Sequence, residues 1–241
     1  MASLIERHAL ITGASSGIGK ATALAFAEAG IHLALVSRSE SKLAAVADEA
    51  RQAGVTVKTY PLDLSQVDQV KERMSAIAAD FGPLDILINN AGIAYTGSLM
   101  ETPLNDWQQV LDLNLTSVFQ CIQSILPSMR DRQQGTIINV VSIGGQQVFP
   151  NWGAYCVSKF GLMALSKALA AEERANGIRV SAICPGSVNT PLWDTETVQA
   201  DFDRSAMLTP EVVAQVILQA VLLPKQAVME ELTLMPNAGV F

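Results

Sequence analysis

The chain has 241 residues, of which 49% are hydrophobic and 16% are charged, and its formal net charge is −7. This acidic balance disfavours a general nucleic-acid-binding surface, and no apolar run approaches the roughly 20 residues that a membrane-spanning helix needs. The N-terminus lacks a signal-peptide pattern and leads directly into a strand pattern, so we expect a cytoplasmic protein without a membrane segment.

The cysteines and histidines exclude several kinds of site. Cys121, Cys156 and Cys184 are odd in number and widely separated, with neither CxxC nor zinc-ligand spacing. We expect them to be reduced and buried, as is usual in a reducing compartment. His8 and His32 stand at the starts of strand patterns without a neighbouring acid or cysteine. Most metal sites and most acid–base schemes that use histidine are therefore excluded, and no metal is expected.

Short β-branched runs alternate with longer helical patterns along the chain. Strands are predicted at 7–12, 31–37, 55–60, 84–89, 135–141, 178–184 and 228–234. Helices are predicted at 16–29, 39–53, 66–81, 103–131 with a break, 152–176 and 209–223. Such alternation is typical of βαβ units, so we expect an α/β fold with a doubly wound parallel sheet covered by helices on both faces. No linker or repeat divides the chain, and a single domain over 1–241 is predicted.

One long irregular stretch interrupts this alternation. Residues 185–208 follow a predicted strand and mix Pro, Thr, Trp and acidic residues. Long loops in compact domains are usually lids or binding loops, so we expect a lid over a substrate site. A surface loop without a function is the alternative.

The sequence TGASSGIG at 12–19 stands between the first predicted strand and the first predicted helix. Gly13, Gly17 and Gly19 would permit a tight turn, close approach of the backbone to a pyrophosphate, and close packing of helix on strand. The N-terminus of the helix would offer free N–H groups and a positive dipole end to the anion. This arrangement predicts a dinucleotide site, with a merely flexible turn as the alternative.

The end of the second predicted strand distinguishes NAD from NADP. An acidic residue there would bind the adenosine ribose, whereas this chain has Ser37 and Arg38, with Glu40 lying beyond the usual position. A guanidinium beside a hydroxyl suits a 2′-phosphate, through charge-assisted hydrogen bonds. We therefore predict NADP(H), with Arg38 as an ordinary solvated charge as the alternative.

Several motifs together resemble the short-chain dehydrogenase/reductase family over nearly the whole length. In order they are TGASSGIG at 12–19, NNAG at 89–92, the asparagine of DLNLTS at 112–117, Ser142, and Tyr155-Cys156-Val157-Ser158-Lys159. PGSVNT at 185–190 is similar to the Pro-Gly loop of the family. The resemblance implies a single-domain Rossmann fold with a seven-stranded parallel sheet, and an NADP-dependent oxidoreductase.

The resemblance also implies catalytic roles. Hydride reduction of a carbonyl leaves an alkoxide, so a proton donor must lie beside its oxygen, and Tyr155 is the expected general acid. Lys159, one helical turn further on, is expected to lower the pKa of Tyr155 from about 10 and to bind the nicotinamide ribose. Ser142 would polarise the carbonyl, and Asn114 would hold a water that links Lys159 to solvent. An exposed Tyr–Lys pair without a function is the alternative.

The same resemblance implies the cofactor contacts. The expected residues are Gly13, Ser15, Ser16, Gly17, Ile18, Gly19, Ser37, Arg38, Asp63, Leu64, Asn90, Ala91, Gly92, Tyr155, Lys159, Pro185, Gly186, Val188 and Thr190. Asp63 is expected at the adenine amino group, and Thr190 at the nicotinamide amide or the phosphates. Purely structural roles are the alternative, with Asn90 as a turn former and Asp63 as a helix cap.

Apolar residues are expected to form the substrate pocket for a small carbonyl compound. The wall candidates are Leu192, Trp193, Phe202, Met207, Val148, Phe149, Trp152 and residues 93–95. Arg204 is the only candidate in the lid for a carboxylate clamp.

The predicted activity is that of an NADPH-dependent carbonyl reductase (EC 1.1.1.-). A 3-oxoacyl-[acyl-carrier-protein] reductase is the second hypothesis, although the ending EELTLMPNAGVF departs from the VNGG-like tail typical of those enzymes. A 3-hydroxy-acid or serine dehydrogenase and a non-catalytic NADP-binding regulator are further alternatives. An intact catalytic set argues against the regulator.

A homo-oligomer, either a dimer or a tetramer, is also expected. The family pairs two long helices of each subunit, which here correspond to 103–131 and 152–176. Both helices carry apolar residues beyond one face, and an exposed apolar face of that size usually has a partner. These residues are Val118, Phe119, Ile122, Ile125, Phe160, Met163, Leu165 and Leu169.

Overall fold

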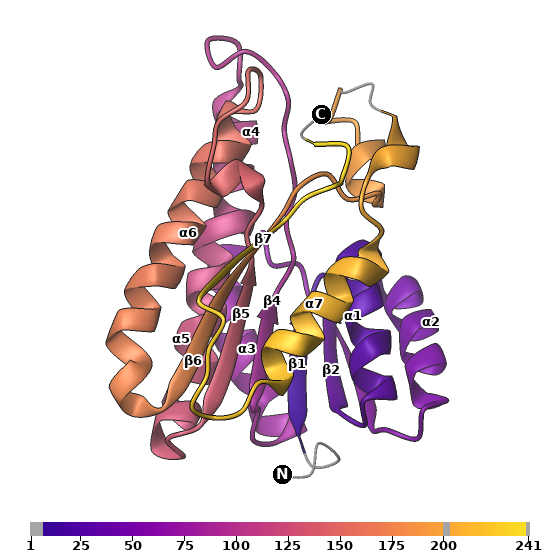
Figure 1. The fold of residues 1–241 in the computed structure, drawn as a ribbon, viewed down its shortest axis with the longest axis vertical. Coiled ribbons are helices and arrows are strands. Elements are labelled where there is room, and N and C mark those ends of the chain that lie inside the picture. Colours follow the sequence, from indigo (N-terminus) through magenta and orange to yellow (C-terminus); the bar gives the residue numbers. More distant parts are fainter. Residues whose placement is uncertain (1–6, 200–202, 240–241) are drawn as a thin grey trace.

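The computed structural model describes residues 7–199 and 203–239, and their seven strands form one parallel sheet in the order β3-β2-β1-β4-β5-β6-β7 (Figure 1). The chain reverses its direction of winding between β1 and β4, which pair through Ala9–Ile86, Leu10–Leu87 and Ile11–Ile88. The strands are β1 (His8–Thr12), β2 (His32–Ser37), β3 (Val57–Pro61), β4 (Ile86–Asn89), β5 (Gly135–Val140), β6 (Ile178–Pro185) and β7 (Glu231–Leu234).

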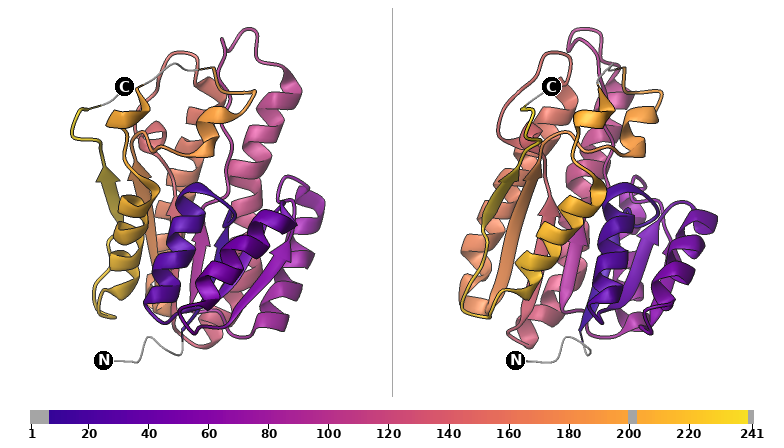
Figure 2. Two further views of the ribbon diagram at one scale, coloured as in Figure 1. Left: turned by 90° about the vertical axis from the view of Figure 1, so that its right-hand side faces the viewer. Right: turned by 45° about the vertical axis from the view of Figure 1, so that its right-hand side comes forward.

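Helices cover both faces of the sheet (Figure 2). One hydrophobic core lies beneath α1, α2 and α7, and includes Phe26, Leu43 and Ile217. A second core lies beneath α3, α5 and α6, and includes Met74 and Ile125. The helices are α1 (Gly17–Glu28), α2 (Glu40–Arg51), α3 (Val67–Phe81), α4 (Leu104–Leu111), α5 (Ser117–Asp131), α6 (Gly153–Glu173) and α7 (Pro210–Leu222).

This architecture confirms the doubly wound α/β fold and every predicted strand, with boundaries that differ by at most three residues. Both faces of a central parallel strand are buried, so near-continuous apolar runs such as IHLALVS mark them clearly in the sequence.

The break expected within 103–131 is not an interruption. Helices α4 and α5 are joined by a π-helical turn, Asp112–Thr116, so the helical path continues through it. A π turn inserts an extra residue, which widens the helix locally and changes the direction of its side chains. Here the turn carries Asn114, whose side chain is fully buried.

The described parts of segment 185–208 beyond the end of β6 at Pro185 are irregular, as predicted, and contain two short 3-10 helices, Pro191–Asp194 and Arg204–Ala206. Hydrogen bonds fasten it to the loop after β4. Thr96 N donates to the carbonyl of Thr197 at 2.8 Å, and Thr197 Oγ1 donates to the carbonyl of Ala94 at 2.8 Å. The segment is therefore tied to a second loop at the same end of the sheet.

The apolar residues expected at a subunit interface are mostly part of the protein's own core. Val118, Ile122, Ile125, Met163 and Leu169 are buried against the sheet, because α5 and α6 pack there. Phe119 and Phe160 alone among the eight are exposed, at 45% and 41%, while Leu165 is partly buried. The prediction of a wide exposed apolar face is therefore wrong, and only a few apolar side chains of these helices are exposed.

Within residues 7–199 and 203–239, no helix is long and apolar enough to cross a membrane. The same residues contain no group of three or more His, Cys, Asp or Glu side chains placed to hold a metal ion. The three cysteines are buried and form no disulfide, as the sequence predicted.

Candidate active site

A cavity of about 820 Å³ opens at the carboxyl ends of the strands, where the winding reverses between β1 and β4. This is the place where open α/β sheets bind ligands, because the loops there diverge to opposite faces. All but two of the predicted site residues line this cavity; Gly19 and Asn114 do not.

The turn after β1 requires its glycines. Gly13 and Gly17 have φ values of +65° and +52°, which other residues rarely adopt. A Cβ on Gly13 would lie 2.9 Å from Ala91 Cα. A Cβ on Gly19 would lie only 2.2 Å from the carbonyl oxygen of Gly13, so Gly19 permits close packing of α1 and does not line the cavity. The turn is thus held close to the loop after β4.

No side-chain hydrogen bond caps the first turn of α1, whose N-cap residue is Ser16. The first N–H groups of a helix have no partner inside it, and they attract anions together with the helix dipole. Ser15, Ser16, Gly17 and Ile18 all line the cavity at this point. The start of α1 is therefore suited to bind a phosphate group.

Asn90 secures the same turn from the neighbouring strand. Its Nδ2 donates to the carbonyl oxygens of Thr12 and Gly13, at 3.0 and 3.3 Å. Thr12 Oγ1 in return accepts hydrogen bonds from the backbone N–H groups of Asn90 and Ala91, at 3.0 and 3.1 Å. These hydrogen bonds join the turn after β1 to the loop after β4. Asn90 therefore stabilises this part of the cavity as well as lining it.

The end of the cavity at β2 is basic. Arg38 is exposed and lines it, and so does Lys42 from the first turn of α2, a residue that the sequence reading missed. Ser37 also lines the cavity, and its buried Oγ has no hydrogen-bond partner among the described residues. The i,i+4 spacing of Arg38 and Lys42 at a helix start was the available signal for Lys42.

Asp63 lines the cavity close to Leu62 and Leu64. Its Oδ1 accepts hydrogen bonds from the backbone N–H and the hydroxyl of Ser65, at 3.0 and 2.8 Å. Helix α3 has Gln66 as its N-cap residue, so Asp63 does not cap that helix. The carboxylate has a second oxygen that accepts none of these bonds.

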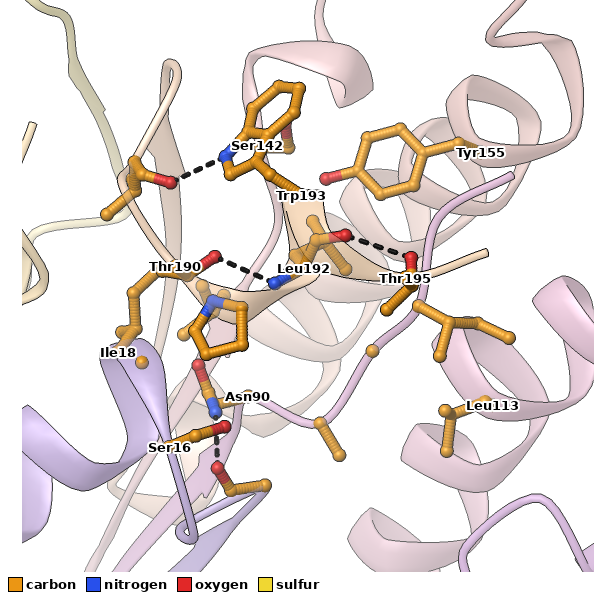
Figure 3. A pocket seen from close by; sticks show the side chains of 18 of the residues that line it. Ser16, Ile18, Asn90, Leu113, Ser142, Tyr155, Thr190, Leu192, Trp193 and Thr195 are labelled. Carbon is orange, nitrogen blue, oxygen red and sulfur yellow. Dashed lines mark hydrogen bonds between the residues drawn. The ribbon is translucent and has the colours of Figure 1, made fainter. Parts of the chain in front are cut away.

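Tyr155 and Ser142 meet at the opposite end of the cavity. The hydroxyl of Tyr155 points toward Ser142, and both side chains face the cavity (Figure 3). Ser142 Oγ accepts a hydrogen bond from Gly144 N at 3.0 Å, which fixes its position. Burial raises the pKa of Tyr155 to about 12, and the hydrogen bond with Ser142 opposes that rise. Tyr155 therefore holds its proton at neutral pH.

Lys159 lies beneath Tyr155 on helix α6. It is 5% exposed, and its Nζ donates to the carbonyl oxygen of Val140 at 3.0 Å. Nζ is 5.8 Å from the centroid of the Tyr155 ring. Burial lowers the pKa of Lys159 to about 8. The expected lowering of the Tyr155 pKa is not found in the protein alone, because burial of the phenol outweighs the other effects.

Asn114 reaches the site from the π turn. Its Nδ2 donates to the carbonyl of Ile93 and to Ser158 Oγ, both at 2.9 Å, and its Oδ1 accepts from Ile93 N at 2.9 Å. Ser158 is buried and also donates to the carbonyl of Tyr155 at 2.7 Å. Asn114 therefore braces the loop after β4 against α6.

Gly92 lies between Asn114 and Lys159. A Cβ at this position would be 3.2 Å from Asn114 Oδ1, which is a tight contact, and 3.7 Å from Lys159 Nζ, which is an ordinary one. Val157, between Tyr155 and Lys159 in the chain, lies on the outer face of α6 and is 47% exposed.

Several apolar side chains line the cavity. Of the predicted wall residues, Ile93, Phe149, Trp152, Leu192 and Trp193 line it. Val148, Met207 and residues 94–95 do not, and Phe202 lies outside the described residues. Val148 is exposed to solvent and Met207 is buried elsewhere in the fold. Several lining residues were not predicted from the sequence, among them Ile143, Gly144, Pro150 and Met235.

The carboxylate clamp proposed for Arg204 is wrong. Its guanidinium pairs with the Asp194 carboxylate and also donates to Asn189 Oδ1 and the carbonyl of Thr190, at 2.9 and 3.0 Å. Arg204 does not line the cavity, whereas Asp194 does. These contacts join separate parts of segment 185–208. Because the charge of Arg204 is neutralised within the segment, the side chain does not act as a clamp for a substrate carboxylate.

Comparisons with known proteins agree with this geometry. The model of a family described as short chain dehydrogenase matches residues 7–201. A 3-oxoacyl-[acyl-carrier-protein] reductase from Thermotoga maritima is 36% identical over 215 residues, which cover 87% of each chain. Glycine betaine reductase ATRR from Emericella nidulans is 34% identical over 240 residues, or 97% of this chain, and the chain spans 19% of the length of that relative.

Solved structures show the same fold. An alcohol dehydrogenase from the archaeon Thermococcus sibiricus, complexed with 5-hydroxy-NADP, has a TM-score of 0.87 and 30% identity, covering 96% of this chain and 97% of its own. A variant of actinorhodin polyketide ketoreductase with NADPH has a TM-score of 0.87 and 31% identity, covering 100% of both chains.

Proposed function

The chain belongs to the short-chain dehydrogenase family and is an NADP(H)-dependent oxidoreductase, and we propose that it reduces the ketone group of a small molecule to an alcohol. The observation that carries this proposal is the placement of Tyr155, Ser142 and Lys159 around one end of a cavity whose other end is suited to a dinucleotide phosphate.

The described residues fit NADP(H). The two cations of Arg38 and Lys42 and the unpartnered hydroxyl of Ser37 lie at the end of β2, where they would hold a 2′-phosphate. The first turn of α1 would hold the pyrophosphate, since its N–H groups have no side-chain cap. Asp63 would accept a hydrogen bond from the adenine amino group. Thr190, Val188 and the Pro185–Gly186 turn would line the nicotinamide end.

NADPH, when bound, supplies the hydride. Ser142, held by Gly144 N, would donate a hydrogen bond to the substrate oxygen and so orient and polarise the carbonyl. Tyr155 would deliver the proton to that oxygen, since its raised pKa keeps it protonated at neutral pH. The ammonium of Lys159 would stabilise the phenolate left behind. Asn114 would hold a relay water near Lys159. This interpretation is supported by Gly92, whose lack of a side chain leaves the space beside Asn114 Oδ1 and Lys159 Nζ open.

A second activity is supported by the relatives. One relative, whose alignment covers 87% of both proteins, is named a 3-oxoacyl-[acyl-carrier-protein] reductase. A β-ketoacyl thioester is therefore the second candidate substrate. The hydroxy-acid dehydrogenase hypothesis is weaker, because the one lid cation, Arg204, is neutralised by Asp194. The hypothesis of a non-catalytic NADP-binding regulator is weaker still. A protein that only senses NADP does not need a complete proton-donor site, and this chain has the residues for one.

Three further features belong to the proposal. Segment 185–208 acts as the lid, supported by its place over the cavity and its bonds to the loop after β4. A homo-oligomer forms through α5 and α6, supported by the exposed Phe119, Val157 and Phe160. A reducing, cytoplasmic location is supported by the three unpaired buried cysteines.

The test is a substrate panel in which the carbonyl compounds are assayed with NADPH and with NADH, and L-serine is assayed with NADP⁺ and with NAD⁺. The panel contains an aromatic ketone, a β-ketoester, a diketone, an acetoacetyl thioester and L-serine. Reduction of the free ketones with NADPH is the expected result, while a clear preference for the thioester would favour the second activity. Turnover of serine alone, or of no compound while NADPH binds, would overturn the proposal.

A further inference from the structure

We propose that the carbonyl site selects uncharged ketones that carry an aromatic ring, and that Trp152 and Trp193 determine this selectivity. The inference rests on the proposed function, because it names the substrate class of the same site. Three features of the cavity carry it: a chain of aromatic contacts, the apolar lining around them, and the absence of an available cation at this end among the residues that the structure describes.

Three rings form a continuous aromatic wall. The Trp152 ring lies 5.5 Å from that of Tyr155, at an interplanar angle of 72°. The Trp193 ring lies 5.7 Å from that of Trp152, at 67°. All three residues line the cavity, so the proton donor and the two indoles bound the same space. Edge-to-face contacts of this kind favour a further ring placed against them.

The two indoles are fixed from different parts of the chain. Trp193 belongs to segment 185–208, and its Nε1 donates to the carbonyl oxygen of Val188 at 2.7 Å. Trp152 precedes α6, and its backbone forms a bridge with Gly97 in the loop after β4. In Figure 3 the ring of Trp193 and the hydroxyl of Tyr155 face the part of the cavity next to Ser142. A substrate ring that contacted Trp193 would thus lie near the proton donor.

The rest of this end supplies carbon surface. Phe149, Leu192, Ile93, Ile143 and Met235 line it beside the indoles. A wall of this composition binds an apolar group through burial of its surface, at about 25 cal/mol per Å². The aromatic rings add a preference for a planar ring over a saturated ring of equal carbon number.

Charges at this end disfavour an anionic substrate. Asp194 lines the cavity, while its partner Arg204 does not. Lys159 is buried and donates to Val140. The remaining cations that line the cavity, Arg38 and Lys42, lie at the β2 end. A substrate carboxylate would therefore lose its hydration near Asp194 without gaining an ion pair.

The test compares acetophenone, cyclohexyl methyl ketone and phenylglyoxylate. Acetophenone and the cyclohexyl ketone share a carbon skeleton and differ in aromaticity, whereas phenylglyoxylate has a carboxylate in place of the methyl group of acetophenone. We expect kcat/KM for acetophenone to exceed that for the cyclohexyl ketone by about three- to tenfold. In Trp193→Leu and Trp152→Leu this ratio falls toward one. Trp107→Leu, which changes a tryptophan on α4 outside the cavity lining, is the matched control and keeps the ratio.

A binding measurement separates this inference from the proposed function. Dissociation constants of the three compounds are measured by ligand-observed NMR, with the protein alone and with NADP⁺. Tighter binding of acetophenone that requires Trp193 supports the inference even if no ketone is turned over, in which case only the proposed function fails. Ketone turnover with equal kcat/KM and equal affinity for both rings overturns the inference alone. Binding of phenylglyoxylate as tight as that of acetophenone overturns the selection of uncharged compounds.

Discussion

The ammonium of Lys159 lies 5.8 Å from the ring centroid of Tyr155 and is bonded to the backbone of β5 through the carbonyl of Val140. The cation is thus held beside the ring in a largely buried position, 5% exposed, where it lines the cavity. Burial disfavours the charged form of each group, so the pKa of the phenol is raised and that of the amine is lowered. At neutral pH this pair is a protonated acid next to a cation, which is the state required for proton delivery.

Tyr155→Phe should reduce the rate of ketone reduction by about 10²- to 10⁴-fold, because it removes the proton donor and leaves the ring contacts in place. The affinity for NADPH, measured by protein fluorescence, should be nearly unchanged. Tyr95→Phe is the control, since Tyr95 does not line the cavity. Rates close to those of the unmodified protein would remove Tyr155 from the mechanism.

The pH dependence of kcat/KM should follow the protonation state of Lys159. Its pKa in the folded protein is about 8, so the ammonium is present below that pH and is lost as the pH rises through it. Because the cation stabilises the phenolate that forms in reduction, kcat/KM with NADPH as the varied substrate should fall above about pH 8; this parameter reports the free enzyme. The pKa of Tyr155, raised by burial to about 12, lies well above this range, so Tyr155 adds no step to the profile. A decline that begins only near pH 10 would contradict the assignment.

Arg38→Ala and Lys42→Ala should each raise KM for NADPH by about tenfold, through loss of a charge-assisted contact with the 2′-phosphate. The KM for NADH should change little, since NADH lacks that phosphate. Lys71→Ala on α3, an exposed lysine outside the cavity lining, is the control for net charge. Equal losses with both cofactors would place these cations elsewhere than at the 2′-phosphate.

Gly19→Ala should lower the free energy of unfolding by about 1–3 kcal/mol or more, because the new Cβ would lie 2.2 Å from the backbone oxygen of Gly13. Displacement of that turn should also weaken NADPH binding. Chemical denaturation and a fluorescence titration measure the two effects. Gly54→Ala, where no atom lies within 4 Å of the new Cβ, should weaken stability through its φ of +80° without affecting NADPH. A similar loss of NADPH affinity in both variants would contradict this account.

Light scattering at micromolar concentration should give the mass of a dimer or a tetramer. The double variant Phe119→Asp, Phe160→Asp should lower that mass, because it places charges on the exposed apolar positions of α5 and α6. Val148→Asp, at a position that is 72% exposed and away from these helices, is the control. A monomeric mass for the unmodified protein would rule out the oligomer.

The fold and the glycine turn could be predicted because their signals are local, whereas most of the cavity lining was implied by the resemblance to a known family. Buried parallel strands require unbroken apolar runs such as IHLALVS, and the turn after β1 requires Gly13 and Gly17 at positive φ. These requirements act within a few residues, so they remain visible in a single sequence. The i,i+4 spacing of Tyr155 and Lys159 is likewise set by helix geometry alone.

The incorrect and missed predictions concern contacts that form only in the folded chain. Arg204 was interpreted as a substrate clamp because only the folded segment brings it onto Asp194 and the carbonyl of Thr190. The apolar residues of α5 and α6 were assigned to an interface because the sequence does not state which side of each helix faces the sheet. Lys42 was missed because it reaches the cavity from the helix that follows β2.

Residue types and short-range spacing were enough to predict the order of strands and helices along the chain and the glycine turn after β1. The tertiary structure alone decided the charge and shape of the substrate end. Trp152 and Trp193 meet there from separate segments, and Asp194 neutralises the only lid arginine. It also decided the pKa values of Tyr155 and Lys159, because burial depends on everything that packs around a group and not on its neighbours along the chain.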